Sequence, residues 1–270
     1  MPSRLSSHRV LRALCVYGIA ALGGSLTLGA SAQGSVPDVA AYRDALAASA
    51  LPQEVKAAVQ ARIDQAPDDF LRLLEAVLAD RRADPMLLYK VDKAKALPAG
   101  YAPADLIGLD GTGLSVSRPG HRLRAAAFHA LKSMSDAASA DGVILEVSSS
   151  YRSYEYQVEV FARNVKELGR DKAEMVSAMP GHSQHQLGEA VDFGSITDAF
   201  AGTKASKWLV ANARRFGFSL SFPKGMTDVT GYAWESWHYR YIGKAAAALE
   251  GRYFGGVQQY LMLFLDAFTS

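Results

Sequence analysis

The chain has 270 residues, with 29 Lys and Arg against 27 Asp and Glu and a formal net charge of +2. Because 49% of the residues are hydrophobic and only 21% are charged, disorder is excluded over most of the chain, and the balanced charge argues against a nucleic-acid partner. The first 32 residues hold three arginines and no acid, which leaves 26 basic and 27 acidic groups in the remainder.

The N-terminus has the pattern of an export signal. Three arginines precede an apolar run over residues 13–30, which ends in Ala30-Ser31-Ala32, an A-x-A cleavage site. A membrane anchor is the alternative, but glycines interrupt the run and no charged stop-transfer flank follows it. We therefore predict a signal peptide over residues 1–32, export to the periplasm or cell envelope, and no stable membrane insertion after signal removal.

The only cysteine, Cys15, lies within this segment. The mature protein then has neither a disulfide nor a thiol nucleophile. Any metal ion must be held by His, Asp or Glu.

Residues 39–82 are rich in alanine and favour helices over 40–50, 52–66 and about 69–78. In the last of these, Phe70, Leu73, Leu74 and Val77 follow the i, i+3, i+4, i+7 spacing of one apolar helical face. We predict a helical extension over residues 33–85 that serves packing or spacing and carries no chemistry.

From residue 86 to 270 the pattern indicates a compact domain in which helices and short strands are mixed. Its predicted elements are a loop at 98–113, helices at 122–140, 154–168 and 206–216, and strands at 142–149, 190–193, 218–222 and 237–242. The apolar run at 260–265 is too short to span a bilayer and predicts a docked core helix. No βαβ spacing is sustained, so the predicted fold class is α+β.

Histidines and acids in two short segments are candidates for a metal site. His185 and Asp192 would stand about 10 Å apart on a straight helix, too far to share one ion, but Gly188 between them permits a turn into a following strand. His238 can supply a third ligand. Two histidines and one carboxylate leave a fourth position for water, as in a catalytic zinc site.

Two further residues suit hydrolysis at such a site. Glu235 lies three residues before His238, near enough to act as a general base outside the ligand set. Arg152 follows a predicted strand end, where its guanidinium can fix a substrate carboxylate or stabilise an oxyanion.

Three motifs together resemble those of VanY-type D-alanyl-D-alanine carboxypeptidases and LD-carboxypeptidases, in the zinc peptidase group that includes lysostaphin-like enzymes and the hedgehog domain. They are Ser-x-Tyr-Arg-Ser with a following Gln over residues 149–157, Ser-x-His-x-x-Gly-x-Ala-x-Asp over 183–192, and Glu-x-Trp-His running into Tyr-Arg-Tyr-x-Gly over 235–243. The resemblance covers about residues 87–243 and implies a small antiparallel sheet that carries the site, with helices packed around it.

The resemblance also implies roles for individual residues. One zinc ion would be bound by His185, Asp192 and His238, with Glu235 as base and then acid. Arg152 would hold the substrate carboxylate or oxyanion, and Gln157 and Ser183 would line the same pocket. This chain departs from the common pattern at Ser150, Gln184 and Ser236, none of which is an expected ligand or base.

The expected function is removal of the C-terminal D-alanine from peptidoglycan stem peptides, with DD or LD specificity open. Two alternatives stay open. A peptidoglycan endopeptidase would need a groove open at both ends, and a non-catalytic zinc-stabilised binding module would have no need of Glu235.

Overall fold

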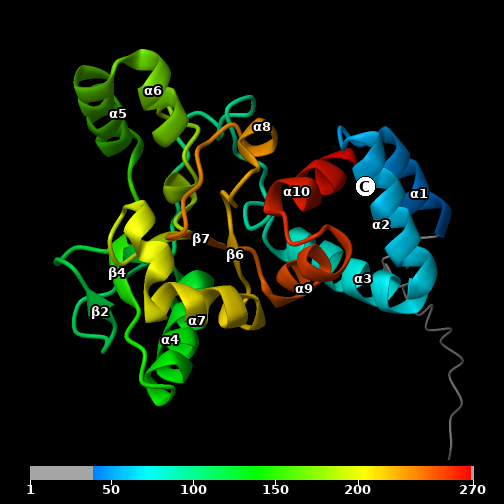
Figure 1. The fold of residues 1–270 in the computed structure, drawn as a ribbon, viewed down its shortest axis with the longest axis horizontal. Coiled ribbons are helices and arrows are strands. Elements are labelled where there is room, and N and C mark those ends of the chain that lie inside the picture. The colour runs from blue at the N-terminus through cyan, green and yellow to red at the C-terminus, as the bar shows by residue number, and fades with distance from the viewer. Residues whose placement is uncertain (1–38, 269–270) are drawn as a thin grey trace, which may run out of the picture. The chain divides into compact units, whose positions relative to one another are not determined.

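The structure is a computed structural model that describes residues 39–268, all within one compact unit. The predicted signal peptide lies outside the described residues. Figure 1 shows helices from both ends of the chain side by side, α1 to α3 in blue and cyan against α9 and α10 in orange and red. Among the described helices, none has the length and apolar character needed to cross a membrane.

The predicted helical extension consists of α1 (Val39–Ala48), α2 (Gln53–Gln65) and α3 (Pro67–Ala83). The predicted apolar face of α3 is buried at all four positions, which confirms the spacing argument. These helices share a hydrophobic core with α9 (Lys244–Tyr253) and α10 (Gln258–Ala267), where the Phe70 ring contacts Tyr253 and Phe264. The docked C-terminal helix is therefore confirmed. Leu87 and Ile242, which belong to the predicted domain at 86–270, lie in the same core as the helical extension. The boundary between the two predicted domains after residue 85 stays a prediction.

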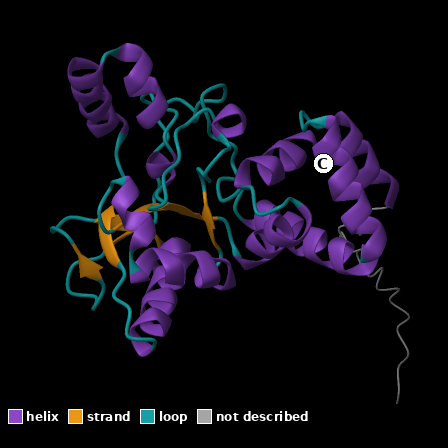
Figure 2. Cartoon of the chain, in the orientation of Figure 1, coloured by secondary structure: helices purple, strands orange, loops and turns teal. Residues whose placement is uncertain are grey.

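A five-stranded sheet forms the centre of the remainder (Figure 2). Its order is β2-β4-β5-β7-β6, with β2 at Ser115–Val116, β4 at Glu146–Ser149, β5 at Ala190–Phe193, β6 at Phe218–Leu220 and β7 at His238–Tyr241. All pairs are antiparallel except β2 with β4, which is parallel. The predicted α+β class with a small, helix-flanked sheet is confirmed.

The side chains on the two faces of β5 have different surroundings. Successive side chains of a strand point to opposite faces. Val191 and Phe193 join the core formed with α4 (Ala125–Ala140) and α7 (Lys204–Asn212), so Ala190 and Asp192 point to the other face. One face of the sheet thus anchors the strand while the other presents a buried carboxylate.

The predicted helix at 122–140 is wrong in its first turn. Residues Arg122–Arg124 form β3, which pairs with β1 (Leu106–Gly108) in a separate two-stranded sheet. β1 lies inside the region predicted as a loop. Leu123 is buried between two arginines that are not, which is the alternation of a strand with one covered face. The helix begins only at Ala125.

The helix predicted at 154–168 is confirmed as α5 (Tyr154–Leu168), capped by the Ser153 hydroxyl, which accepts from the Tyr156 N–H, and ended by Gly169. The helix that follows, α6 (Arg170–Val176), was not predicted. The helix predicted at 206–216 divides into α7 and a 3₁₀ turn at Ala213–Phe216. The strands predicted at 142–149 and 218–222 are longer than the observed β4 and β6. A one-turn helix, α8 (Thr227–Thr230), follows β6.

Because Asp69 of α3 forms an ion pair with Arg252 of α9, we predict that the thermal stability of the protein depends on pH. Hydrogen bonds from Arg252 and Arg72 lower the pKa of Asp69 to about 2. A lowered pKa in the folded state stabilises the protein above the pKa of the unfolded state, and this contribution disappears as the pH falls through the folded-state value. We expect Asp69→Asn to lower the melting temperature at pH 7, and by less at pH 3.

Thermal unfolding at both pH values measures this difference. Asp68→Asn is the matched control, because Asp68 lies in the same first turn and makes no ion pair among the described contacts. Equal effects of Asp69→Asn at pH 7 and pH 3 would contradict the assignment.

Candidate metal centre and active site

Asp192 occupies the middle of the sheet, between β4 and β7. The strand register pairs it with Ser149 on one side and with His238 on the other. Its side chain is buried, and its neighbours on the sheet are therefore the first residue of β7 and the last residue of β4. The pairing of β5 with β7 alone brings together two of the three predicted ligands.

His185 reaches the same place from a 3₁₀ turn at Gln184–Leu187. The Ser183 hydroxyl caps the turn by accepting from the His185 N–H, and Gly188 ends it with φ +75°. A side chain at Gly188 would place its Cβ 2.9 Å from Arg124 Cγ, so both the backbone conformation and the space require glycine. This turn brings His185 back towards Asp192, as the sequence predicts.

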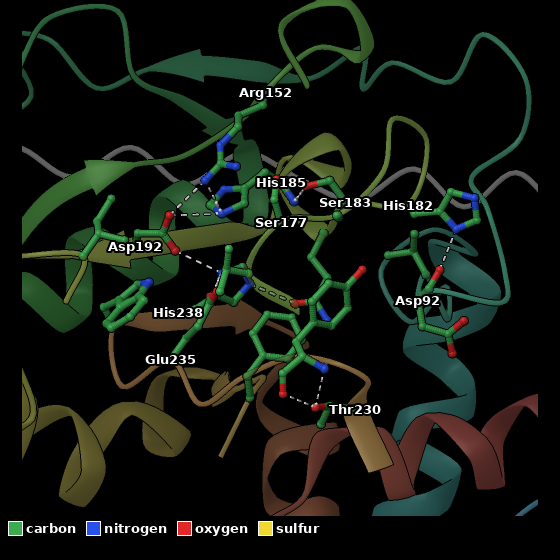
Figure 3. A pocket seen from close by; sticks show the side chains of 18 of the residues that line it. Asp92, Arg152, Ser177, His182, Ser183, His185, Asp192, Thr230, Glu235 and His238 are labelled. Atoms are coloured by element: carbon green, nitrogen blue, oxygen red, sulfur yellow. Dashed lines mark hydrogen bonds and ion pairs between the residues drawn. The ribbon is translucent and has the colours of Figure 1, made fainter. Parts of the chain in front are cut away.

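The three predicted ligands converge in one cluster (Figure 3). One donor atom from each of His185, Asp192 and His238 lies within 4.8 Å of the others. His185 Nε2 lies 3.2 Å from Asp192 Oδ2, and His238 Nδ1 lies 3.0 Å from Asp192 Oδ1. These are the separations expected of atoms that share one small cation.

The protonation of the two rings tests whether a metal fits. His185 Nδ1 donates to the Ser150 carbonyl (2.8 Å), and His238 Nε2 donates to Gln184 Oε1 (3.2 Å). In the neutral form of each ring, the opposite nitrogen bears a lone pair aimed at Asp192. Asp192 Oδ1 is buried and receives no hydrogen bond from any described residue. This holds even though His238 Nδ1 lies close to it. Lone pairs that face a carboxylate repel it, and a divalent cation between them removes the repulsion, so the donor set fits zinc.

Burial and neighbouring charges keep His185 and Asp192 in their metal-binding protonation states. Burial and the charge of Arg152 lower the pKa of His185 to about 4, so the ring is neutral at pH 7. Burial raises the pKa of Asp192, but positive charge and donated hydrogen bonds from the protonated forms of His185 and His238 bring it well below the usual value. The site thus presents the neutral imidazole of His185 and the carboxylate of Asp192.

Glu235 lies beside the cluster, as predicted. Its Oε2 is 3.4 Å from His238 Nδ1, and a turn closed by the His238 N–H and the Glu235 carbonyl (3.3 Å) brings it there. Burial and the negative charge of Asp192 raise the pKa of Glu235 well above its ordinary value, although Arg152 opposes the shift. A carboxyl group with a raised pKa can both take and return a proton.

Arg152 lies on the opposite side of the cluster, three residues after β4. Its Nη2 donates to Asp192 Oδ2 (3.0 Å) and lies 3.0 Å from His185 Nε2. Its Nε donates to the Ser149 hydroxyl at 3.1 Å. The guanidinium is thereby held at the edge of the cluster, where it also lines two cavities.

Gln157 and Ser183, which were predicted to line the same pocket, occupy different environments. Gln157 is fully buried beneath Arg152, from which it accepts at 3.4 Å, and it donates to the Ala178 carbonyl at 2.7 Å. It is not among the residues that line the cavities at the cluster. Ser183 does line one of them. His182 also lines it, with Nδ1 2.7 Å from the Asp92 carbonyl (Figure 3).

Two cavities of unequal size lie beside the cluster, and only the smaller is lined by the three ligands themselves. The smaller has a volume of about 90 Å³, and the larger about 490 Å³. Both are lined by Arg152, Ser177, Glu235 and Trp237. The larger continues along α5 past Tyr156 and Asn164.

Several residues of the site were not predicted. The smaller cavity is also lined by Asp92, Tyr232 and Gln259. Gln259 belongs to α10 and donates to Asp92 Oδ2 at 2.9 Å. The only signal in the sequence is the polar pair at 258–259 before the apolar run, which periodicity assigns to an ordinary helix start.

Comparisons with known proteins agree with this geometry. Residues 120–244 match the VanY family, described as D-alanyl-D-alanine carboxypeptidase. YodJ of Bacillus subtilis, which carries a provisional carboxypeptidase name, is 40% identical over 168 residues, which are 60% of this chain and 62% of YodJ. The chain thus covers less than two thirds of that relative.

Two solved structures are similar over most of their own length. The LdcB LD-carboxypeptidase is 36% identical with a TM-score of 0.58, over 64% of this chain and 88% of LdcB. A zinc-bound mutant of the D,D-pentapeptidase VanY from a VanB-type vancomycin resistance cassette is 33% identical with a TM-score of 0.56, over 65% of this chain and 98% of that one.

The geometry predicts that loss of one ligand abolishes tight metal binding. We expect His185→Ala to lower zinc affinity by more than about 100-fold, because mutation of groups that only orient ligands already costs ~10- to 100-fold. Metal content after dialysis and competition with a chelator measure the effect. His129→Ala is the control, since His129 is an exposed histidine of α4. Equal zinc content in both variants would refute the assigned ligand set.

Proposed function

The chain belongs to the VanY family of D-alanyl-D-alanine carboxypeptidases, and we propose that it is an exported zinc carboxypeptidase that removes the C-terminal D-alanine from peptidoglycan stem peptides. The observation that carries the proposal is the convergence of three metal-ligand atoms within 4.8 Å beside the Glu235 carboxyl group. Ligands alone would suit a structural ion, whereas an adjacent proton acceptor suits hydrolysis.

Each residue of the cluster has a role in the proposed reaction. When bound, zinc would supply a Lewis acid that polarises the scissile carbonyl and acidifies the attacking water. Glu235 takes the proton from that water and returns it to the leaving amine. Arg152 offsets negative charge, either of the substrate's terminal carboxylate or of the oxygen on the attacked carbon.

The unequal cavities support cleavage of a terminal residue over cleavage of an internal bond. At roughly 10–15 Å³ of comparable volume for each water, the smaller cavity of about 90 Å³ holds about six to nine waters, which is room for a small residue such as alanine. The larger cavity of about 490 Å³ lies in the range of roughly 300–1,000 Å³ typical of ligand sites, and it would take the rest of the peptide. A cross-linked internal substrate would need a larger space on both sides.

The proposed substrate requires that the protein be exported. The signal pattern of residues 1–32 supports an extracytoplasmic location, where cell-wall peptides are found. Removal of this segment can be tested by N-terminal sequencing of the protein recovered from the cell envelope of an expressing bacterium. Ala32-Gln33 is the expected cleavage point.

The peptidase proposal predicts loss of one alanine from synthetic stem peptides. The zinc-loaded protein is incubated with a tetrapeptide and a pentapeptide stem, and the products are identified by mass spectrometry. Cleavage of the tetrapeptide alone identifies an LD-carboxypeptidase, and cleavage of the pentapeptide alone identifies a DD-carboxypeptidase. We expect Glu235→Gln to lower kcat by about 100-fold or more, since general acid–base groups contribute ~10²- to 10⁴-fold, with zinc content unchanged.

Glu75→Gln, at an exposed position of α3, is the matched control and should retain full activity. Zinc-loaded protein that cleaves only a cross-linked dimer would favour the endopeptidase. Protein that binds one zinc and cleaves none of these substrates would favour the binding module.

A further inference from the structure

The ability of His238 to bind a metal through Nδ1 depends on which way the Gln184 amide faces. With Oε1 towards the ring, Gln184 accepts from His238 Nε2 at 3.2 Å and leaves the Nδ1 lone pair free. If the amide turned over, its NH₂ group would face Nε2, and the proton of the neutral ring would move to Nδ1. A protonated Nδ1 cannot hold a cation, so something must fix the amide.

The Ser221 hydroxyl alone does not determine the orientation of the Gln184 amide. The Ser221 hydroxyl lies 2.7 Å from Gln184 Oε1, but a hydroxyl can donate or accept and would suit either orientation. The discriminating neighbour is Gln258. Its Oε1 accepts from Gln184 Nε2 at 3.2 Å, and an amide oxygen can only accept.

The orientation of Gln258 is itself set by the backbone of β6. Gln258 is buried, and its Nε2 lies 3.5 Å from the Ser219 carbonyl and 3.3 Å from the Ser221 hydroxyl. Because a carbonyl only accepts, the NH₂ group of Gln258 faces Ser219 and its oxygen faces Gln184. The direction of hydrogen bonding is thus determined from a main-chain carbonyl through two amides to His238.

Gln258 begins α10, which belongs to the layer of helices from the two ends of the chain and not to the matched residues 120–244. This layer holds α10 in place, because Arg81 of α3 donates to the Leu265 carbonyl at 2.6 Å. Asp266 of α10 also pairs with Lys95, in the loop after α3. α10 also packs against α1 and α9. The position of Gln258 is therefore determined by the helical layer.

From these contacts we propose that Gln258 is a positioning residue that selects the metal-binding tautomer of His238 through Gln184, and that it couples the helical layer to the metal centre. The inference rests on the proposed function in one respect, because it takes His238 to be a zinc ligand. It assigns a role to a residue outside the three shared motifs.

The test compares metal binding in Gln258→Met, Gln184→Met and the double variant. Methionine has nearly the volume of glutamine but no amide, which preserves packing while removing the hydrogen bonds. Affinities for Zn²⁺ and Co²⁺ are measured by chelator competition, and the visible absorption of bound Co²⁺ reports the ligand geometry. Gln65→Met, at an exposed position in the last turn of α2, is the matched control.

We expect Gln258→Met to weaken metal binding by about tenfold, at the lower end of the ~10- to 100-fold typical of groups that orient ligands. The double variant should bind no more weakly than Gln184→Met, because Gln258 acts through Gln184. In metal-free protein, ¹⁵N NMR should show the Nε2–H tautomer of His238 in the parent and a mixture in Gln258→Met. If Gln258→Met fails to fold, Gln258→Asn, which keeps the amide but is one methylene shorter, should show the same loss.

Binding within twofold of the parent together with an unchanged tautomer would overturn the inference, as would strictly additive losses in the double variant. These readouts need no turnover, so a protein that binds metal but cleaves no peptide contradicts the proposed function alone. If the parent binds no metal, the proposed function falls, and the tautomer spectrum still decides whether Gln258 controls the His238 ring.

Discussion

The antiparallel pairing of β5 with β7 is the constraint on which the site depends. In the observed register Asp192 lies opposite His238, and the other ligands and helpers are placed relative to these two. A slip of one residue would turn Asp192 to the opposite face of the sheet. The register is anchored at the other end of the pair, where the buried carboxylate of Glu189 bonds Arg240 Nε at 3.1 Å and Arg124 Nη1 at 3.0 Å. A buried ion pair of this kind is costly to form but strongly opposes a shift that would separate its members.

The electrostatics of the cluster are arranged for a cation and not for the stability of the chain alone. Each histidine gives its proton to a fixed acceptor, the Ser150 carbonyl or Gln184, and turns its lone pair towards Asp192. With both rings neutral and no cation present, the lone pairs and the carboxylate repel one another, which is a local conflict of the kind found at functional sites. Arg152 relieves part of it by donating to Asp192. The same arginine lines both cavities, so one positive charge contacts the cluster and faces both cavities.

How much the sequence predicts depends on whether a feature is local. The helix at Tyr154–Leu168 has its cap at Ser153 and its stop at Gly169, and the buried face of α3 follows from four apolar residues at helical spacing. The site was predictable because a turn at Gly188 and a strand pair bring short motifs together. β1 and β3 were missed because their pairing joins residues 14 to 18 positions apart in short segments, which leaves no periodic pattern. The contacts of Gln258 and Gln259 span even longer separations, and nothing in the helix itself indicates them.

The packing of the helical layer gives these long-range contacts a physical basis. One hydrophobic core contains Phe70 of α3, Leu261 of α10 and Ile242, the residue that directly follows β7. The strand that carries His238 therefore ends in the same core that holds α10, and the amide of Gln258 approaches the opposite side of that histidine through Gln184. Displacement of α10 would act on His238 from two directions, through its hydrogen bonds and through the end of its strand. The helical extension, which contributes no predicted ligand, is for this reason part of the structure that determines the geometry of the proposed metal site.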